Sequence, residues 1–229
     1  MKKFQKLIPA FCLLLVSAVL MGTSTFAWFS MNKNVTATGM TIKANSDNPF
    51  LVIAAGNTFD SSSIATNVST KTTEKKLYPV MPVSALTSAN VTTAASWQYA
   101  YSNDPDSATK TGDYIACTDL TNYVASEKFM IGLNEKSGVE SAANLKLTGV
   151  TIDANKGIGV VVVCGTNIYT FTETFTSSGA ETAKALATEV TKTGTEVTVY
   201  YYLNGEDTNV KTTNAENLGG SVTLNFAID

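Results

Sequence analysis

The residues that could carry chemistry in this chain are few. Cys117 and Cys164 lie outside the apolar leader and could form one disulfide, or could serve as small buried apolar side chains. Glu206 and Asp207 are adjacent carboxylates, and hard cations such as Ca²⁺ take clustered carboxylate oxygens. They follow Asn204-Gly205, a pair typical of tight turns, so a turn is favoured and a Ca²⁺ site is the open alternative.

The chain contains no histidine, and this excludes several kinds of active site. A Ser-His-Asp triad, a His-activated cysteine and an HExxH zinc helix all require that residue. A pair of carboxylates could still serve a secreted hydrolase. However, none of the 19 acidic residues forms a pair set among apolar or aromatic neighbours. We therefore expect no enzymatic activity and no cofactor.

The basic residues are all lysine, because the sequence contains no arginine. Arginine is the side chain most used for bidentate recognition of phosphates and base edges. Nucleic acid is therefore not an expected partner. The formal net charge of −3 indicates a mildly acidic chain that is not attracted to anionic membrane surfaces.

The first residues are typical of a secretory signal peptide. Three lysines precede an apolar run over residues 7–21, and Thr25 and Ala27 supply the small side chains that a signal peptidase accepts. The run is shorter than the roughly 20 residues of a spanning helix, so cleavage before Trp28 is favoured over a retained membrane anchor. The mature chain would then be exported, with a formal net charge of −6 because three lysines leave.

Alternation of apolar and polar residues predicts an all-β chain. Apolar residues recur at every second position in four runs, which marks strands with one buried face: 97–101, 129–133, 197–203 and 222–228. Residues 157–163 are apolar on both parities and predict a strand covered on both faces. The alternation changes parity at Gly39 and at Gly149, which predicts β-bulges there.

One segment favours a helix instead. Residues 178–181 (SGAE) resemble a capping box. The apolar residues that follow share one helical face: Ala183, Leu186, Ala187 and Val190. We expect one or two short helices in the chain, this one among them.

The organisation indicates a single domain over residues 28–229. Residues 54–122 hold three prolines and long polar stretches, and we interpret them as a loop-rich insertion within that domain. Many short strands with Gly and Asn turns predict a two-sheet sandwich, for which the jelly roll is a common solution. Trp97, Tyr99 and Tyr101 on one strand favour core packing, with a stacking platform for sugars as the alternative.

Both ends of the chain resemble one protein family. The matching residues are 24–30 (STFAWFS), 34–43 (NVTATGMTIK), 197–207 (VTVYYYLNGED) and 221–226 (SVTLNF). These stretches are similar to the processing region, first strand and last two strands of the TasA/camelysin family of secreted Gram-positive proteins. The resemblance is poor across residues 54–122.

The resemblance implies a jelly-roll subunit of biofilm-matrix or cell-surface fibres, processed by a signal peptidase. In such fibres the freed N-terminal segment of one subunit adds as a strand to the next, and other matrix components can take part. Some members are described as metalloproteases, which the lack of histidine does not support here.

The residues favour the same mode of assembly for a physical reason. Cleavage would free residues 28–38, a segment with strand character, and a neighbour's open sheet edge could bind it through main-chain hydrogen bonds. We expect it to act as a donor strand in a head-to-tail homopolymer, through Trp28, Phe29, Ser30, Met31 and Val35. Two alternatives remain: Trp28 and Phe29 could pack on their own domain, or the chain could be a monomeric surface adhesin or glycan-binding module.

Overall fold

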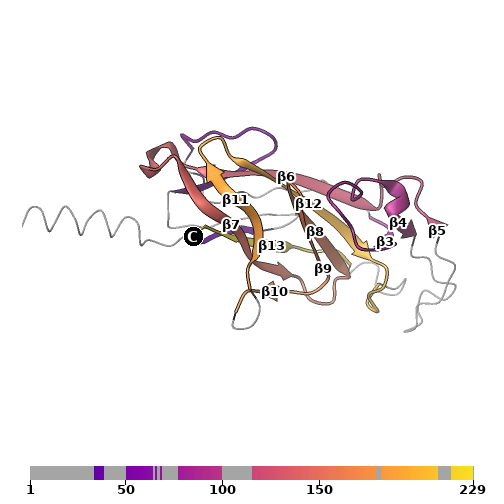
Figure 1. Cartoon of the computed structure of the whole chain (residues 1–229). Helices are drawn as coiled ribbons and strands as arrows, with labels where there is room; N and C mark the ends of the chain where they lie inside the picture. Colours follow the sequence, from indigo (N-terminus) through magenta and orange to yellow (C-terminus); the bar gives the residue numbers. More distant parts are fainter. Residues whose placement is uncertain are drawn as a thin grey trace, which may run out of the picture.

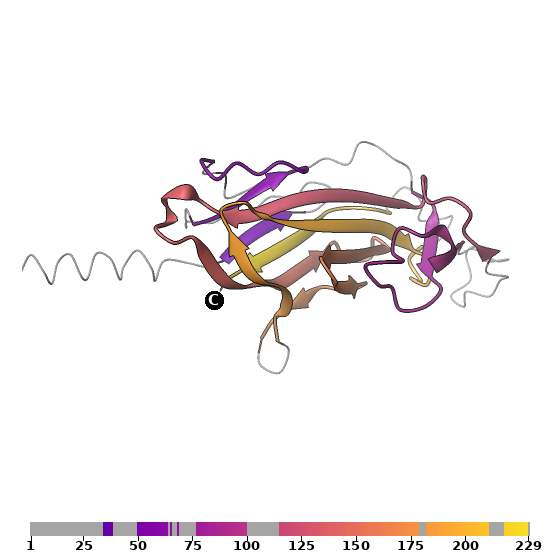
Figure 2. The same ribbon diagram turned by 45° about the horizontal axis from the view of Figure 1, so that its top comes forward.

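The structure is a computed structural model of the chain. It describes residues 34–38, 50–63, 65, 68, 77–99, 115–178, 182–210 and 218–228. These residues form two β-sheets packed face to face (Figures 1 and 2), which confirms the predicted all-β sandwich.

The smaller sheet contains the strand nearest the N-terminus among the described residues. Its strands are β1 (Asn34–Thr38), β7 (Ser141–Ile152), β10 (Phe175–Thr176), β11 (Lys184–Thr191) and β13 (Val222–Ala227). They are ordered β1-β13-β7-β10, and β11 also pairs with β7. All of these pairings are antiparallel. Within the described residues, β1 is the outermost strand and pairs with β13 alone.

The larger sheet is built on two long central strands. Its strands are β2 (Leu51–Ala55), β3 (Pro79–Pro82), β4 (Trp97–Tyr99), β5 (Ile115–Ala116), β6 (Val124–Leu133), β8 (Ile158–Cys164), β9 (Asn167–Phe171) and β12 (Thr195–Asn204). The main path is β2-β6-β12-β3-β4-β5, with β8 pairing both β12 and β9. Figures 1 and 2 show β3, β4 and β5, with the 3-10 helix η1 (Ala94–Ser96), gathered at one end of the sandwich.

Side chains from both sheets meet between the layers in what we call the main core. It consists of Leu51, Ile53, Phe129, Ile131, Leu133, Leu145, Leu147, Val150, Ile152, Ile158, Val160, Val162, Cys164, Phe171, Phe175, Leu186, Val190, Val197, Val199, Tyr201, Val222, Leu224 and Phe226. The alternating runs of the sequence supply its inward positions on β6, β12 and β13. The period of two in the sequence therefore places one face of each strand in the core.

A second cluster lies on the outer face of the larger sheet, beneath the predicted insertion. It consists of Val80, Leu86, Val91, Trp97, Cys117, Val161 and Tyr202. The Trp97 and Tyr202 rings meet edge to face, 5.0 Å apart at 72°. Tyr202 lies over Gly159 of β8, where a Cβ would overlap the ring. Strand β8 is thus covered on both faces, as predicted for residues 157–163.

The predicted helix at residues 178–190 is wrong, because residues 184–191 form strand β11. Leu186 and Val190 are both buried in the main core. A register shift between Ala185 and Ala187 interrupts the pairing of β11 with β7. A spacing of four residues places Leu186 and Val190 on one face of a strand as well as on one face of a helix, so this pair fits both structures. Among the described residues the helices are the short 3-10 turns η1 and η2 (Glu135–Ser137).

The predicted bulge at Gly149 is confirmed, whereas Gly39 lies outside the described residues. Asn225 pairs with Gly149 while the next residue, Phe226, pairs with Leu147, so Thr148 is the extra residue. A Cβ at position 149 would approach Asn225 Nδ2 to 2.6 Å, so glycine leaves room for the Asn225 side chain against β7. The bulge allows Leu147 and Val150 to face the same core despite their odd spacing.

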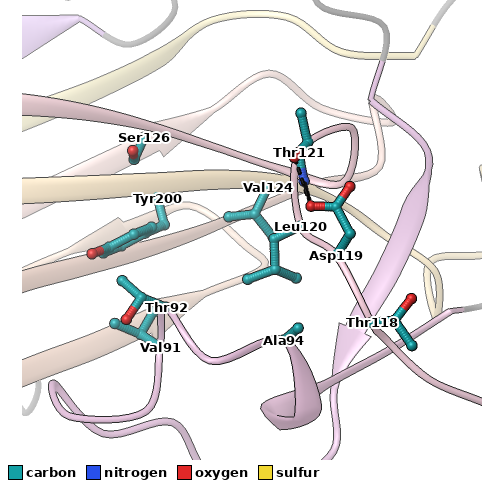
Figure 3. A pocket seen from close by; sticks show the side chains of 10 residues that line it. All are labelled: Val91, Thr92, Ala94, Thr118, Asp119, Leu120, Thr121, Val124, Ser126 and Tyr200. Carbon is teal, nitrogen blue, oxygen red and sulfur yellow. Dashed lines mark hydrogen bonds between the residues drawn. The ribbon is translucent and has the colours of Figure 1, made fainter.

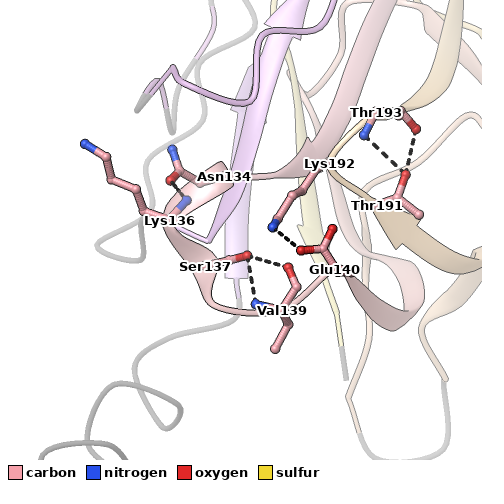
Figure 4. Close-up of polar contacts among 8 residues, drawn as sticks. All are labelled: Asn134, Lys136, Ser137, Val139, Glu140, Thr191, Lys192 and Thr193. Carbon is pink, nitrogen blue, oxygen red and sulfur yellow. Dashed lines mark hydrogen bonds and ion pairs between the residues drawn. The ribbon is translucent and has the colours of Figure 1, made fainter.

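Polar contacts fix the turns at the C-terminal end of β6 (Figure 4). Asn134 is buried at 2% exposure; its Oδ1 accepts from the Lys136 amide and its Nδ2 donates to the Ser63 carbonyl. Lys192, in the turn between β11 and β12, forms an ion pair of 2.6 Å with Glu140. These bonds join the turns that connect the two sheets, so they hold the strand ends in register.

Candidate functional site

The residues of the predicted donor segment fall into two groups. Those outside the described residues include the cleavage site: Thr25, Ala27, Trp28, Phe29, Ser30 and Met31. Val35 belongs to β1, whose five residues pair antiparallel with β13 of the same chain. Val35 lies opposite Phe226, and Thr38 lies opposite Thr223. The chain thus supplies a strand for the β13 edge from its own N-terminal part.

Strand β13 is a rigid support for whatever strand pairs with it. Val222, Leu224 and Phe226 are buried in the main core with exposures of 1%, 0% and 0%. Asn225, opposite Thr36, has a buried Oδ1 with no hydrogen-bond partner among the described residues. An unsatisfied buried acceptor costs about 1–3 kcal/mol. Strand β13 therefore carries one unsatisfied polar atom within the described residues.

The possible disulfide between Cys117 and Cys164 is not formed, and the alternative of buried thiols is the one observed. Both thiols are free and buried, Cys117 in the second cluster and Cys164 in the main core. The outer and inner faces of the larger sheet separate the two clusters, which is the physical reason the cysteines do not meet. Burial raises the pKa of both thiols to about 11, aided by Asp119 at Cys117 and by Glu196 at Cys164. Both behave as apolar side chains.

The segment around Glu206 and Asp207 forms a turn after β12. The Glu206 amide donates to Asn204 Oδ1, and the Asp207 amide donates to the Asn204 carbonyl. Asp207 Oδ1 accepts from the backbone and side chain of Asn209. Within the described residues, no group of three or more Asp, Glu, Cys or His side chains is placed to hold a metal ion. The Asp207 carboxylate orders the loop itself.

Trp97 is part of the core, as its alternation favoured, and it is not a platform for sugars. Its side chain is 0% exposed, and its Nε1 donates to the Val91 carbonyl at 2.9 Å. The side chain of Tyr99 and the whole of Tyr101 lie outside the described residues.

A groove opens where the insertion stops covering the larger sheet (Figure 3). Its volume is about 420 Å³. Its lining comes from the insertion, from β6 and from β12: Val91, Thr92, Ala94, Thr118, Asp119, Leu120, Thr121, Val124, Ser126 and Tyr200. Sequence analysis missed it because its residues, from Val91 to Tyr200, are separated by up to 109 positions. The Thr-Asp-Leu-Thr run at 118–121 is the one local signal of polar side chains brought together.

Comparisons of the chain with protein-family models, with curated proteins and with solved structures gave no match. Within the described residues, no helix has both the length and the apolar character needed to cross a membrane.

Proposed function

We propose that this chain is a secreted structural subunit that assembles into cell-surface or biofilm-matrix fibres. Assembly proceeds by head-to-tail exchange of the mature N-terminal segment, residues 28–38. The observation that carries the proposal is the position of β1. The last five residues of that segment lie on an outer edge of the sandwich, attached to β13 by backbone pairing.

Exchange requires no new interface at this edge. A segment that leaves its own β13 and pairs with β13 of a neighbour forms the same ladder between two molecules. Trp28 and Phe29 precede the paired residues and would add anchors, each contributing about 1.5–3 kcal/mol if fully buried. Because the donated strand and the accepting edge are different surfaces, the contact can propagate without closing.

The first test compares the mature chain, residues 28–229, with a variant that lacks residues 28–38. Electron microscopy and sedimentation should show fibres for the mature chain and monomers for the variant. Adding a synthetic peptide of residues 28–38 in excess should cap growing fibres and shorten them, because it occupies the accepting edge without offering one of its own.

A cross-linking test distinguishes exchange from self-pairing. Thr38 is paired with Thr223 in the backbone register of β1 and β13, and paired residues on adjacent strands are within the reach of a disulfide. In fibres, T38C/T223C should oxidise to a covalent ladder on a non-reducing gel. The same variant oxidised as a monomer should lock the segment in place and lose the ability to polymerise until it is reduced.

The matched control is T151C/T223C. Thr151 faces Thr223 across β7 and β13, so this disulfide joins two strands of one sheet interior to the exchanged segment. It should stay intramolecular in monomers and in fibres. If fibres form while the T38C/T223C bond stays intramolecular, strand exchange is contradicted. If the mature chain remains monomeric at every concentration, the whole proposal is contradicted and the monomeric adhesin is favoured.

A further inference from the structure

The groove beside Tyr200 lies where the cover over the larger sheet ends. Tyr200 and Tyr202 lie on the same face of β12, two residues apart. Tyr202 is 1% exposed because Trp97 and the insertion cover it. Tyr200 is only partly buried, next to Val161 of β8 and Ser126 of β6 in the sheet register. One aromatic side chain of the outer face is therefore left beside an open groove.

The groove combines an apolar floor with hydroxyl groups around it. Figure 3 shows Leu120 and Val124 between Tyr200 at one end and the Asp119–Thr121 pair at the other. Hydroxyl groups come from two separate parts of the chain: Thr92, Thr118 and Thr121 from the insertion side, and Ser126 and Tyr200 from the sheet. Burial raises the pKa of the Tyr200 hydroxyl, so at neutral pH it stays protonated and able to donate.

The polar groups at the far end are held in place. Asp119 Oδ1 accepts from the Thr121 amide at 3.0 Å and from the Thr121 hydroxyl at 2.6 Å. The carboxylate is thus fixed by its own turn, which limits the entropy lost when a ligand binds to it. The volume of about 420 Å³ lies at the lower end of the range of small-molecule sites.

The charges of the lining restrict the class of ligand. Among the described residues, no lysine lines the groove and the one charged side chain of the lining is Asp119, so an anion would meet repulsion without a counter-charge. A single carboxylate does not make a divalent-cation site. A purely apolar ligand would remove the hydroxyl groups from water without replacing their hydrogen bonds. The groove fits an uncharged ligand that has hydroxyl groups at its rim and C–H groups on one face.

We infer that this groove binds an uncharged saccharide of one or two rings. The C–H face of a pyranose would lie against the Tyr200 ring and the aliphatic floor, since the aromatic face is electronegative. The sugar hydroxyls would exchange hydrogen bonds with Asp119, Thr121 and Ser126. The insertion would then provide one wall of a carbohydrate site. This function is separate from strand exchange, because β1 and β13 contribute no residue to the groove.

Saturation-transfer NMR on the mature chain tests the inference. The probes are methyl glycosides of glucose, galactose and N-acetylglucosamine, their β-linked disaccharides, and glucuronic acid as a charged analogue. At least one neutral probe should bind, and glucuronic acid should bind more weakly. Y200L should reduce the affinity by up to about tenfold, the most an aromatic face contributes. Y200F, which keeps the ring, should stay within about threefold of the wild type.

The matched control is Y78L. Tyr78 is an exposed tyrosine of the same region, at 53% exposure, and does not line the groove. Its substitution should leave binding unchanged, and thermal melts should show that Y200L and Y200F remain folded. The inference is overturned if no neutral probe binds, if only charged probes bind, or if Y78L abolishes binding while Y200L does not.

Discussion

The main core and the second cluster are built on opposite faces of the same sheet, and they differ in what they join. The main core collects side chains from both sheets, so each layer covers the other. The second cluster takes Val161 and Tyr202 from the sheet, and its other members come from segments of the insertion between residues 80 and 117. Short strands and turns cover one face there, with no second long sheet.

The difference indicates that the second cluster depends on the sandwich more than the sandwich depends on the second cluster. The buried side chains of the main core come from the strands of the two sheets, and from the insertion the partly buried Val68 and Leu77 pack against them. The insertion has no comparable layer of its own and needs the outer face of β8 and β12 beneath it. We therefore expect the second cluster to open at a lower free energy than the main core.

The largest expected effect is on the free energy of unfolding, and two matched truncations, F129A and W97A, test the two regions separately. Both side chains are 0% exposed, Phe129 in the main core and Trp97 in the second cluster. F129A should lower the free energy of global unfolding by about 3–5 kcal/mol, through lost burial and the cavity left behind. W97A should release the insertion and leave the sandwich transition much less affected. Hydrogen exchange and urea unfolding of each variant measure both effects.

The expected difference between the two regions is contradicted if W97A shifts the global unfolding transition in urea as far as F129A does, and if both regions lose amide protection together. The chain would then be one cooperative unit. Limited proteolysis provides the complementary measurement: W97A should be cut within residues 77–123 while the fragment carrying β6 to β13 stays intact.

A second, smaller effect is expected on the alkylation rates of the two cysteines, each of which reports on one region. Each thiol is buried, and its pKa of about 11 keeps it protonated and unreactive at pH 8. Alkylation therefore requires opening of the surrounding cluster. In moderate urea, Cys117 should react at least about tenfold faster than Cys164, which corresponds to about 1.4 kcal/mol less opening energy. Mass spectrometry of iodoacetamide-treated peptides measures both rates in one sample.

The variants C117A and C164A identify each reaction, and fully denatured protein gives the intrinsic rates. Once the surrounding cluster opens, burial no longer raises the pKa of the exposed thiol, so the rate should rise about tenfold per pH unit only up to the ordinary thiol pKa of about 8.5. Equal protection of Cys117 and Cys164 from alkylation at all urea concentrations would contradict the expectation that the second cluster opens before the main core.

The same comparison explains how much the sequence could predict. The main core follows from alternation, because a period of two along β6, β12 and β13 assigns inward positions without knowledge of the partner strand. The bulge at Gly149 could also be predicted, since the parity change and the glycine occur together. Strand β11 was wrongly expected to be a helix because the four-residue spacing of Leu186 and Val190 fits one face of a strand or of a helix, and only pairing with β7 decides between the two.

The second cluster and the groove could not be predicted in the same way. Trp97 meets Tyr202 only because β3 pairs with the end of β12 in parallel and carries β4 with it. Alternation along one segment contains no information about such a contact. The separation of Cys117 from Cys164 has the same origin, since a pair of cysteines in a sequence does not reveal on which face of a sheet each will lie.

The smallest expected effect locates the boundary of the main core along β6. Glu127 is partly buried between Ala125 and Phe129, in register with Val199, and burial raises its pKa above the ordinary 4.5. From 4.5 up to that raised pKa, the folded state binds more protons than the unfolded state, so stability falls as pH rises through this window. E127Q removes this cost and should stabilise the chain at pH 7, by no more than about 0.5 kcal/mol, with no gain at pH 4. Thermal melts of E127Q and wild type at both pH values measure the difference, and E135Q, at an exposed glutamate, is the control. A destabilised E127Q at pH 7 would mean that the Glu127 carboxylate holds the end of β6 in place, and the main core would then extend past Phe129 toward the insertion.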